Sequence, residues 1–154
     1  MNARCAMLAA VVACGAVLAA GGTASAAVES KKPVIRPVSE LKWENNASVP
    51  GSQVATIWGD PQKGAYGALK KIPMGVGLPM HTHSREQRVI VIEGTMALSI
   101  EGSPLTEMGP GSYAVIPAGI KHAANCHTGV DCVYFEEQPG AADIIPVGRG
   151  TAKK

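Results

Sequence analysis

Residues 79–94 read PMHTHSREQRVIVIEG, a pair of histidines followed by a short apolar run that ends at a glycine. His81 and His83 lie two positions apart, and Gln87 follows four positions after the second histidine. Residues two and four apart in an extended chain share one face, so these three side chains can point the same way even with a turn at residues 84–86. Two imidazoles and one amide oxygen on a common face are suitable ligands for a metal ion.

A third histidine lies in GSYAVIPAGIKHAAN, residues 111–125. Pro117 and Gly119 predict a tight turn, which would direct the strand that carries His122 back toward the first pair. Three imidazoles and an amide oxygen suit a divalent ion such as Zn, Ni, Fe, Cu or Mn, and leave coordination positions open for water or substrate. We therefore expect one divalent transition-metal ion with four ligands, His81, His83, Gln87 and His122.

Short apolar runs separated by turn residues extend on both sides of these motifs. The chain contains 18 glycines and 11 prolines, and only 4% of its residues are aromatic, which is typical of a turn-rich β protein. No stretch after the first 26 residues keeps a 3.6-residue apolar period long enough for a helix. We predict an all-β fold, a closed antiparallel sandwich or barrel. Its eight predicted strands span residues 53–58, 66–72, 77–83, 87–92, 96–100, 113–116, 121–125 and 133–137.

The spacing within both histidine motifs resembles that of the cupin superfamily. The matching patterns are Gly75-x5-His81-x-His83-x3-Gln87-x6-Gly94 and Gly111-x5-Pro117-x-Gly119-x2-His122. The resemblance covers residues 51–147 and implies a single-domain cupin, that is, a double-stranded β-helix or jelly-roll barrel. More narrowly, the chain resembles a group of small exported bacterial cupins of unknown function.

Gln87 departs from this resemblance, because most metal cupins carry a glutamate at that position. Glu86 is a poor substitute, since a shift of one residue turns the side chain to the other face of the strand, and we expect it at the rim. Two interpretations of Gln87 stay open: its amide oxygen binds the metal, as in some cupins that open or isomerise sugar acids, or the amide only hydrogen-bonds a ligand histidine or a water. Neutral ligands leave the ion its full positive charge, which favours isomerase or lyase chemistry over a dioxygenase.

Three further side chains are candidates for the pocket wall, Tyr113, Tyr134 and Asn125. Tyr134 could also donate a proton, although core packing explains its presence as well. No strong general acid or base lies in the matched segments, so the sequence leaves open whether the protein is an enzyme. We expect it to act on, or to bind, a small oxygen-rich molecule at the metal; the alternatives are a non-catalytic module of the cell envelope and a vestigial, empty site.

The first 26 residues predict a secretory signal peptide. Arg4 supplies a positive charge, CAMLAAVVACGAVLAA is apolar, and residues 24–26 read ASA, a small-residue cleavage site. A membrane anchor and lipoprotein processing at Cys14 are the alternatives. We expect an exported protein, periplasmic or secreted, with no membrane span after processing.

The rest of the chain divides by composition. Residues 27–50 are polar and interrupted by three prolines, so we expect an extended arm with one edge strand near residues 34–35. Residues 51–147 form the predicted cupin domain, and residues 148–154 a flexible tail. The net charge of +2 is too small to predict a nucleic-acid or anionic-membrane partner, so the expected partner is a small molecule.

Cys126 and Cys132 remain once the predicted leader is removed. In an oxidising compartment an even number of cysteines usually forms disulfides. Gly129 and Asp131 are turn formers, so the two cysteines could face each other across a hairpin, and closing this loop would contribute about 2–3 kcal/mol. A redox-active or metal-binding thiol pair beside His127 is the alternative.

The apolar run at residues 89–92, VIVI, is apolar on both faces of its predicted strand. One face can fill the barrel, and the other must also leave water. Either the N-terminal arm or a second subunit would cover it, and we expect a homodimer.

Overall fold

The computed structural model describes residues 32–127 and 129–148. The chain divides into two units, Met1–Val34 and Ile35–Lys154, and every element below lies in the second unit. The predicted signal peptide, residues 1–26, lies outside the described residues, as do all but the first residue of the predicted tail. Among the described residues, no helix is long and apolar enough to cross a membrane.

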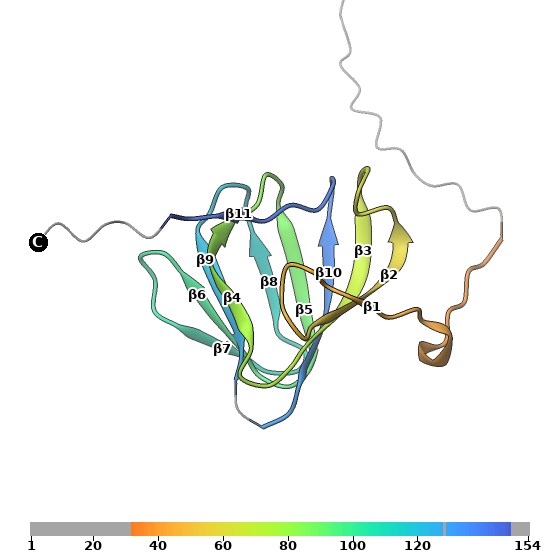
Figure 1. The fold of residues 1–154 in the computed structure, drawn as a ribbon, viewed down its shortest axis with the longest axis horizontal. Helices are drawn as coiled ribbons and strands as arrows, with labels where there is room; N and C mark the ends of the chain where they lie inside the picture. Colours follow the sequence, from red (N-terminus) through yellow and green to blue (C-terminus); the bar gives the residue numbers. More distant parts are fainter. Residues whose placement is uncertain (1–31, 128, 149–154) are drawn as a thin grey trace, which may run out of the picture. The chain divides into compact units, whose positions relative to one another are not determined.

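The described part of the chain is almost entirely β-structure (Figure 1). Its elements are η1 (Val38–Glu40), β1 (Glu44–Asn45), β2 (Gln53–Gly59), β3 (Tyr66–Ile72), β4 (Gly77–Thr82), β5 (Gln87–Glu93), β6 (Met96–Ile100), β7 (Thr106–Met108), β8 (Tyr113–Ile116), β9 (His122–Cys126), β10 (Cys132–Gln138) and β11 (Ile145–Pro146). The eight predicted strands all form, and no strand end differs from its prediction by more than one residue. The predicted all-β fold is confirmed.

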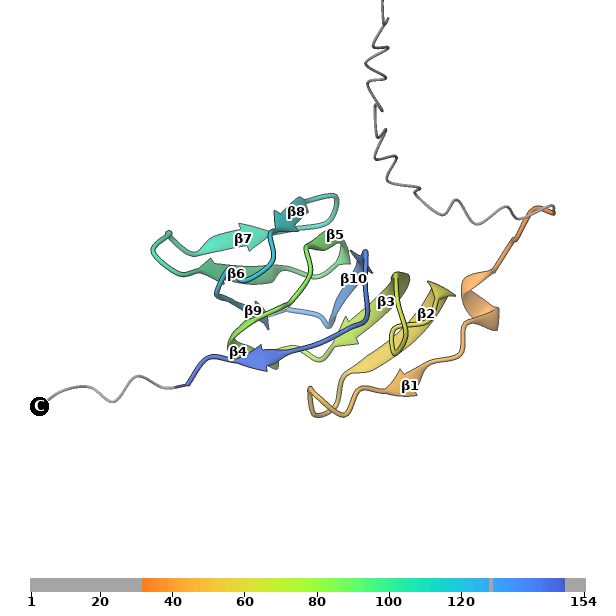
Figure 2. The same cartoon turned by 90° about the horizontal axis from the view of Figure 1, so that it is seen from above.

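The strands form two antiparallel sheets that make opposite sides of a barrel (Figure 2). The six-stranded sheet has the order β1-β2-β3-β10-β5-β8, and the five-stranded sheet has the order β11-β4-β9-β6-β7. Strands distant in sequence are therefore neighbours: β10 lies between β3 and β5, and β9 lies between β4 and β6. This order places β4 and β9, the strands of the two motifs that carry His81 and His122, side by side in the five-stranded sheet, whereas β5 and β10 belong to the opposite sheet.

The start of the domain differs from the prediction. The edge strand is β1, which pairs with β2, and the predicted edge strand near residues 34–35 is wrong. Val34 and Ile35 are exposed, because neither finds a neighbouring strand among the described residues. The end of the predicted arm packs against the barrel instead, where Val49 is 2% exposed.

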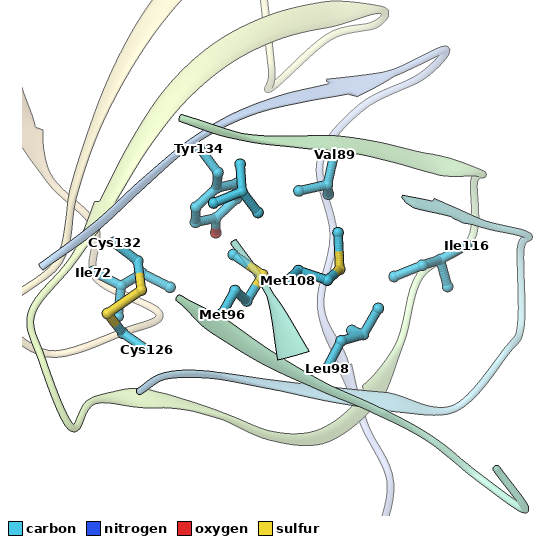
Figure 3. Close-up of a cluster of buried hydrophobic side chains, with 10 residues drawn as sticks. Ile72, Val89, Met96, Leu98, Met108, Ile116, Cys126, Cys132 and Tyr134 are labelled. Atoms are coloured by element: carbon cyan, nitrogen blue, oxygen red, sulfur yellow. A yellow bond between two sulfur atoms is a disulfide. The ribbon is translucent and has the colours of Figure 1, made fainter. Parts of the chain in front are cut away.

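Alternating burial along the strands builds the core. In β5 the side chains of Val89 and Val91 are buried, whereas those of Ile90 and Ile92 are 43% and 49% exposed. This is the period of two expected of a strand with one face in a core. Figure 3 shows the resulting cluster between the sheets, and its buried members are Ile72, Val89, Val91, Met96, Leu98, Met108, Ile116, Cys126, Cys132 and Tyr134.

The predicted disulfide between Cys126 and Cys132 is present, with 5.5 Å between the two Cα atoms (Figure 3). The two cysteines do not face each other across a hairpin, as the sequence suggested. Cys126 ends β9 in one sheet and Cys132 begins β10 in the other. The bond therefore joins the two sheets at the edge of the core.

Candidate metal centre

Three buried histidines from both motifs lie together inside the barrel. His81 in β4 and His122 at the start of β9 are direct partners in the ladder between these strands. His83 follows the end of β4, and its carbonyl oxygen accepts the backbone N–H of Gly119 at 2.9 Å. This hydrogen bond joins the turn of the second motif to the first motif. Gly119 has φ +77°, a backbone conformation that residues with a side chain disfavour, so a glycine suits this turn. The three imidazoles are at most 5% exposed.

The backbone selects the same tautomer for all three rings. Each ring bonds a backbone carbonyl through Nδ1, and a carbonyl only accepts, so Nδ1 must carry the proton. The pairs are His81 with Pro79 at 2.7 Å, His83 with Asp143, and His122 with Ile120 at 3.0 Å. Each Nε2 is thereby left with a free lone pair, which is the form that binds metal ions.

These rings converge on one point. One ring nitrogen from each histidine lies within 4.8 Å of the other two, and the ring centroids are 4.2 to 5.1 Å apart. Nitrogens that bind the same tetrahedral ion at about 2.0–2.1 Å lie about 3.4 Å apart, so the three imidazoles would draw closer together on coordination. Nε2 of His83 and of His122 is buried with no hydrogen-bond partner among the described residues, and a cation would satisfy both. The donor set fits a metal ion.

Burial keeps these imidazoles neutral. Loss of hydration lowers the pKa of His81, His83 and His122 below the ordinary value of 6.5, and the backbone hydrogen bond to each ring only partly opposes this. Neutral imidazole is the ligand form, so near neutral pH no proton needs to leave before an ion binds.

Gln87 begins β5 in the opposite sheet and lines the same cavity as the histidines. Its side chain is 7% exposed, and its Nε2 donates to Oε2 of Glu136 at 2.7 Å. The described residues give no hydrogen bond between Gln87 and a histidine. Glu86 is half-exposed and pairs with Arg88, so its carboxylate lies away from the cavity.

Glu136 is a functional candidate that the sequence reasoning missed. It lies in β10, is fully buried, and accepts hydrogen bonds from Tyr66 Oη at 2.5 Å and Lys70 Nζ at 2.6 Å in addition to Gln87. Burial alone would raise the pKa of Glu136, but the Lys70 ammonium and the two neutral donors hold it below its usual value. In the structure, position 136 shares the buried face of β10 with residues 132, 134 and 138, but the sequence hides this face, because Val133 and Phe135 on the other face are also apolar.

Of the three other residues predicted to line the pocket, one lines the cavity and two do not. Tyr134 lines the cavity and is 6% exposed. Tyr113 does not line it: it pairs with Ile90 on the outer face of the sheet and is 58% exposed. Asn125 is exposed on β9 and is also absent from the cavity wall. Residues of opposite parity on a strand face opposite sides, so their proximity to the motifs in sequence did not bring them to the site.

Two hollows lie beside the cluster and share part of their lining. The inner cavity, about 40 Å³, is bounded on its deep side by apolar core residues, and it has room for an ion and about two water molecules. The outer groove, about 250 Å³, opens beside it and is lined mainly by polar side chains. Asn46, Lys70, His83 and Ile144 border both. The histidines therefore line a small cavity with many apolar neighbours, next to a larger and mainly polar groove.

A family model described as cupin domain matches residues 68–136, and no curated protein matches the chain. Solved structures share the fold at low identity. The structure of KdgF from Halomonas sp. is 22% identical with a TM-score of 0.57, over 67% of this chain and 92% of that one. The polyketide cyclase RemF from Streptomyces resistomycificus is 21% identical with a TM-score of 0.64, over 78% and 87%. The DMSP lyase DddQ from Ruegeria pomeroyi DSS-3 is 19% identical with a TM-score of 0.57, over 75% and 64%.

Proposed function

The chain belongs to the cupin superfamily, and from this premise we propose that it is an exported metal-dependent protein acting on a small oxygen-rich molecule, by isomerase- or lyase-like chemistry. One observation carries the proposal. One ring nitrogen from each of His81, His83 and His122 lies within 4.8 Å of the other two beside a cavity that all three line, and Nε2 of His83 and of His122 is buried without a partner among the described residues. Gln87 lines the same cavity and is the proposed fourth ligand.

A bound divalent ion would polarise a carbonyl or carboxylate group, or lower the pKa of a bound water. The chain supplies the surroundings. The polar outer groove admits the molecule, Lys70 and Asn46 stand where the groove meets the cavity, and the apolar floor limits the water that can enter. Burial raises the pKa of Tyr134 well above 10, so its hydroxyl keeps its proton and can donate a hydrogen bond to a bound molecule.

Two considerations favour isomerase or lyase chemistry over a dioxygenase. The proposed ligands are four neutral groups, which leave the ion its full charge and stabilise an oxidised metal poorly. Solved structures with the same fold include a polyketide cyclase and a DMSP lyase. The same ligands could also hold a metal without chemistry, so a non-catalytic metal- or small-molecule-binding module is the second candidate function.

Metal content tests the proposal directly. Protein purified from its own compartment should contain close to one equivalent of a divalent transition metal, and a His81→Ala, His83→Ala double variant should contain almost none. His127→Ala is the matched control, because this exposed histidine pairs with Glu107 outside the cavity and its loss should leave the metal content unchanged. Equal metal in the protein and in the double variant would refute the metal site.

Export and self-association complete the proposal. The disulfide between Cys126 and Cys132 supports export, because such bonds persist in oxidising compartments. The outer face of β5 and β8 supports a homodimer: Ile90, Tyr113 and Val115 are 43%, 58% and 44% exposed, and an apolar surface of this kind is suited to a second copy. β1 lies at the far edge of the same sheet from β8, so this part of the arm does not cover that face.

A further inference from the structure

The carboxylate of Glu136 divides its two oxygens between different partners. Oε2 accepts the Nε2–H of Gln87 at 2.7 Å. Oε1 accepts the hydroxyl of Tyr66 at 2.5 Å and the ammonium of Lys70 at 2.6 Å. Glu136 is fully buried, and Lys70 is the cation that pairs with it. Oε1 also accepts the Nε2–H of Gln138 at 3.4 Å, so each oxygen of Glu136 holds at least one donor.

This arrangement decides which way the amide of Gln87 faces. The oxygen and nitrogen of an amide are nearly identical in shape, so only its partners distinguish them. An ionised carboxylate accepts and cannot donate, so Nε2 must face Glu136. Oε1 is bonded to the same carbon and is turned away from that carboxylate, and no described residue donates a hydrogen bond to it. A free acceptor therefore remains on a side chain that lines the histidine cavity.

The same contact explains why position 87 is not a glutamate. A carboxylate there would face the carboxylate of Glu136 at hydrogen-bond distance, inside the protein, with Lys70 as the one cation that the structure places against Glu136. Two like charges at that distance repel strongly in a buried site. The neutral amide removes the repulsion and adds a hydrogen bond.

We propose that Glu136 is the positioning residue that holds Gln87 as a neutral oxygen ligand of the metal. This inference rests on the proposed metal site. The fourth ligand is then neutral because of Glu136, which lies on β10 and outside the histidine motifs and disfavours a glutamate at position 87. Glu136 borders the same cavity, but its carboxylate does not belong to the cluster of ligand atoms that lie within 4.8 Å of one another, so in this proposal it acts through Gln87.

An exchange of the two side chains tests the proposal. In the double variant Gln87→Glu, Glu136→Gln, the amide of residue 136 can donate to the carboxylate of residue 87, while its oxygen still accepts from Tyr66 and Lys70. The single variants Gln87→Glu and Glu136→Gln lack this match. Glu137→Gln is the control, since this neighbour is half-exposed and lies 3.7 Å from Arg88, away from the cavity.

The readouts are the affinity for Co²⁺ alone and the visible absorption spectrum of the Co²⁺ form. Removal of a residue that orients a metal ligand typically weakens binding 10- to 100-fold. We expect Glu136→Gln to bind Co²⁺ at least tenfold more weakly, and the double variant to bind at least as tightly as the unchanged protein, with a shifted spectrum because a carboxylate has replaced an amide oxygen. Gln87→Glu alone should bind about tenfold more weakly than the double variant.

A metal-free readout separates positioning from folding. The side-chain NH₂ of Gln87 should give an NMR signal that is protected from exchange in the unchanged protein and in Glu137→Gln, and unprotected in Glu136→Gln. Unchanged Co²⁺ affinity and spectrum in Glu136→Gln, or equal affinities for Gln87→Glu and the double variant, would overturn the positioning role while leaving the metal site intact. Absence of Co²⁺ binding in the unchanged protein would instead remove the proposed function and this inference with it.

Discussion

His81 and His122 lie directly opposite each other in the ladder between β4 and β9, although they belong to motifs in different halves of the domain. Their ring centroids are 4.2 Å apart. Each Nδ1 is hydrogen-bonded to the backbone carbonyl two residues earlier in the chain, that of Pro79 for His81 and that of Ile120 for His122. Backbone pairing therefore sets the distance between the two imidazoles, and backbone hydrogen bonds set their orientation. A site held in this way is preformed before any ion arrives.

A preformed site of this kind should couple metal binding to stability. Binding to the folded state alone raises the free energy of unfolding by about 2.7 kcal/mol when the free metal is 100 times its Kd. We expect chelation to lower the melting temperature of the protein and readdition of the native ion to restore it. In the His81→Ala, His83→Ala double variant, calorimetry should show the same melting temperature with and without chelator.

The lowered histidine pKa values predict how the metal-free protein responds to acid. The unfolded chain binds protons at its imidazoles below about pH 6.5, whereas the folded chain does so only at the lower pKa of His81, His83 and His122. The unfolded state therefore holds more protons in this interval, and the free energy of unfolding should fall as the pH drops below 6.5. Urea titrations of the metal-free form at pH 5.5 and 7.5 measure this loss; equal stability at both values would contradict it.

Lys70 should matter for stability because it neutralises a buried charge. Its side chain is 17% exposed, and its partner Glu136 is fully buried. Breaking such a pair on one side typically costs about 3–5 kcal/mol, so we expect Lys70→Met to lower the free energy of unfolding by about that amount. The control is Lys71→Met on the same strand, whose exposed pair with Asp131 should contribute less than about 1 kcal/mol.

A second substitution checks the cause of that loss. Adding Glu136→Gln to Lys70→Met removes the unpaired charge and should recover part of the stability. If chemical denaturation shows the double variant to be less stable than Lys70→Met, the carboxylate is not the source of the penalty.

The disulfide between the sheets should contribute measurably to folding. Replacing Cys126 and Cys132 by alanine should lower the free energy of unfolding by about 2–4 kcal/mol. Reduction of the unchanged protein should have a similar effect, and it should have no effect on the alanine variant. Denaturant midpoints that are identical with and without reductant would show that the bond is not a stabilising link.

The proposed homodimer can be tested on its outer face. Ile90→Glu places a charge beside Tyr113 and Ile92, and we expect it to convert a dimer to a monomer in sedimentation velocity experiments. Leu105→Glu is the matched control, because this residue is 60% exposed but lies in the loop between β6 and β7. An unchanged protein that sediments as a monomer at micromolar concentration would rule out the dimer.

Local sequence patterns predicted most of the strands because burial in this chain alternates with a period of two. β3, β6 and β8 match their predicted bounds without change. The strands that were not predicted, β1, β7 and β11, have two or three residues each, too few for an alternation to register. β1 also lies in a polar segment, and only its pairing with β2 makes it a strand.

The sequence by itself determined the two histidine motifs and their place at strand ends, because each of these depends on residues within a few positions of one another. Only the tertiary structure decided what surrounds them. Glu136 lies beside Gln87 because β10 pairs with β5. The disulfide joins the two sheets because β9 and β10 belong to different sheets. Tyr113 pairs with Ile90, and both side chains lie on the outer face. The alternation along a strand gives the face of each side chain, but the partner on that face is set by strand order, which depends on contacts between distant parts of the chain.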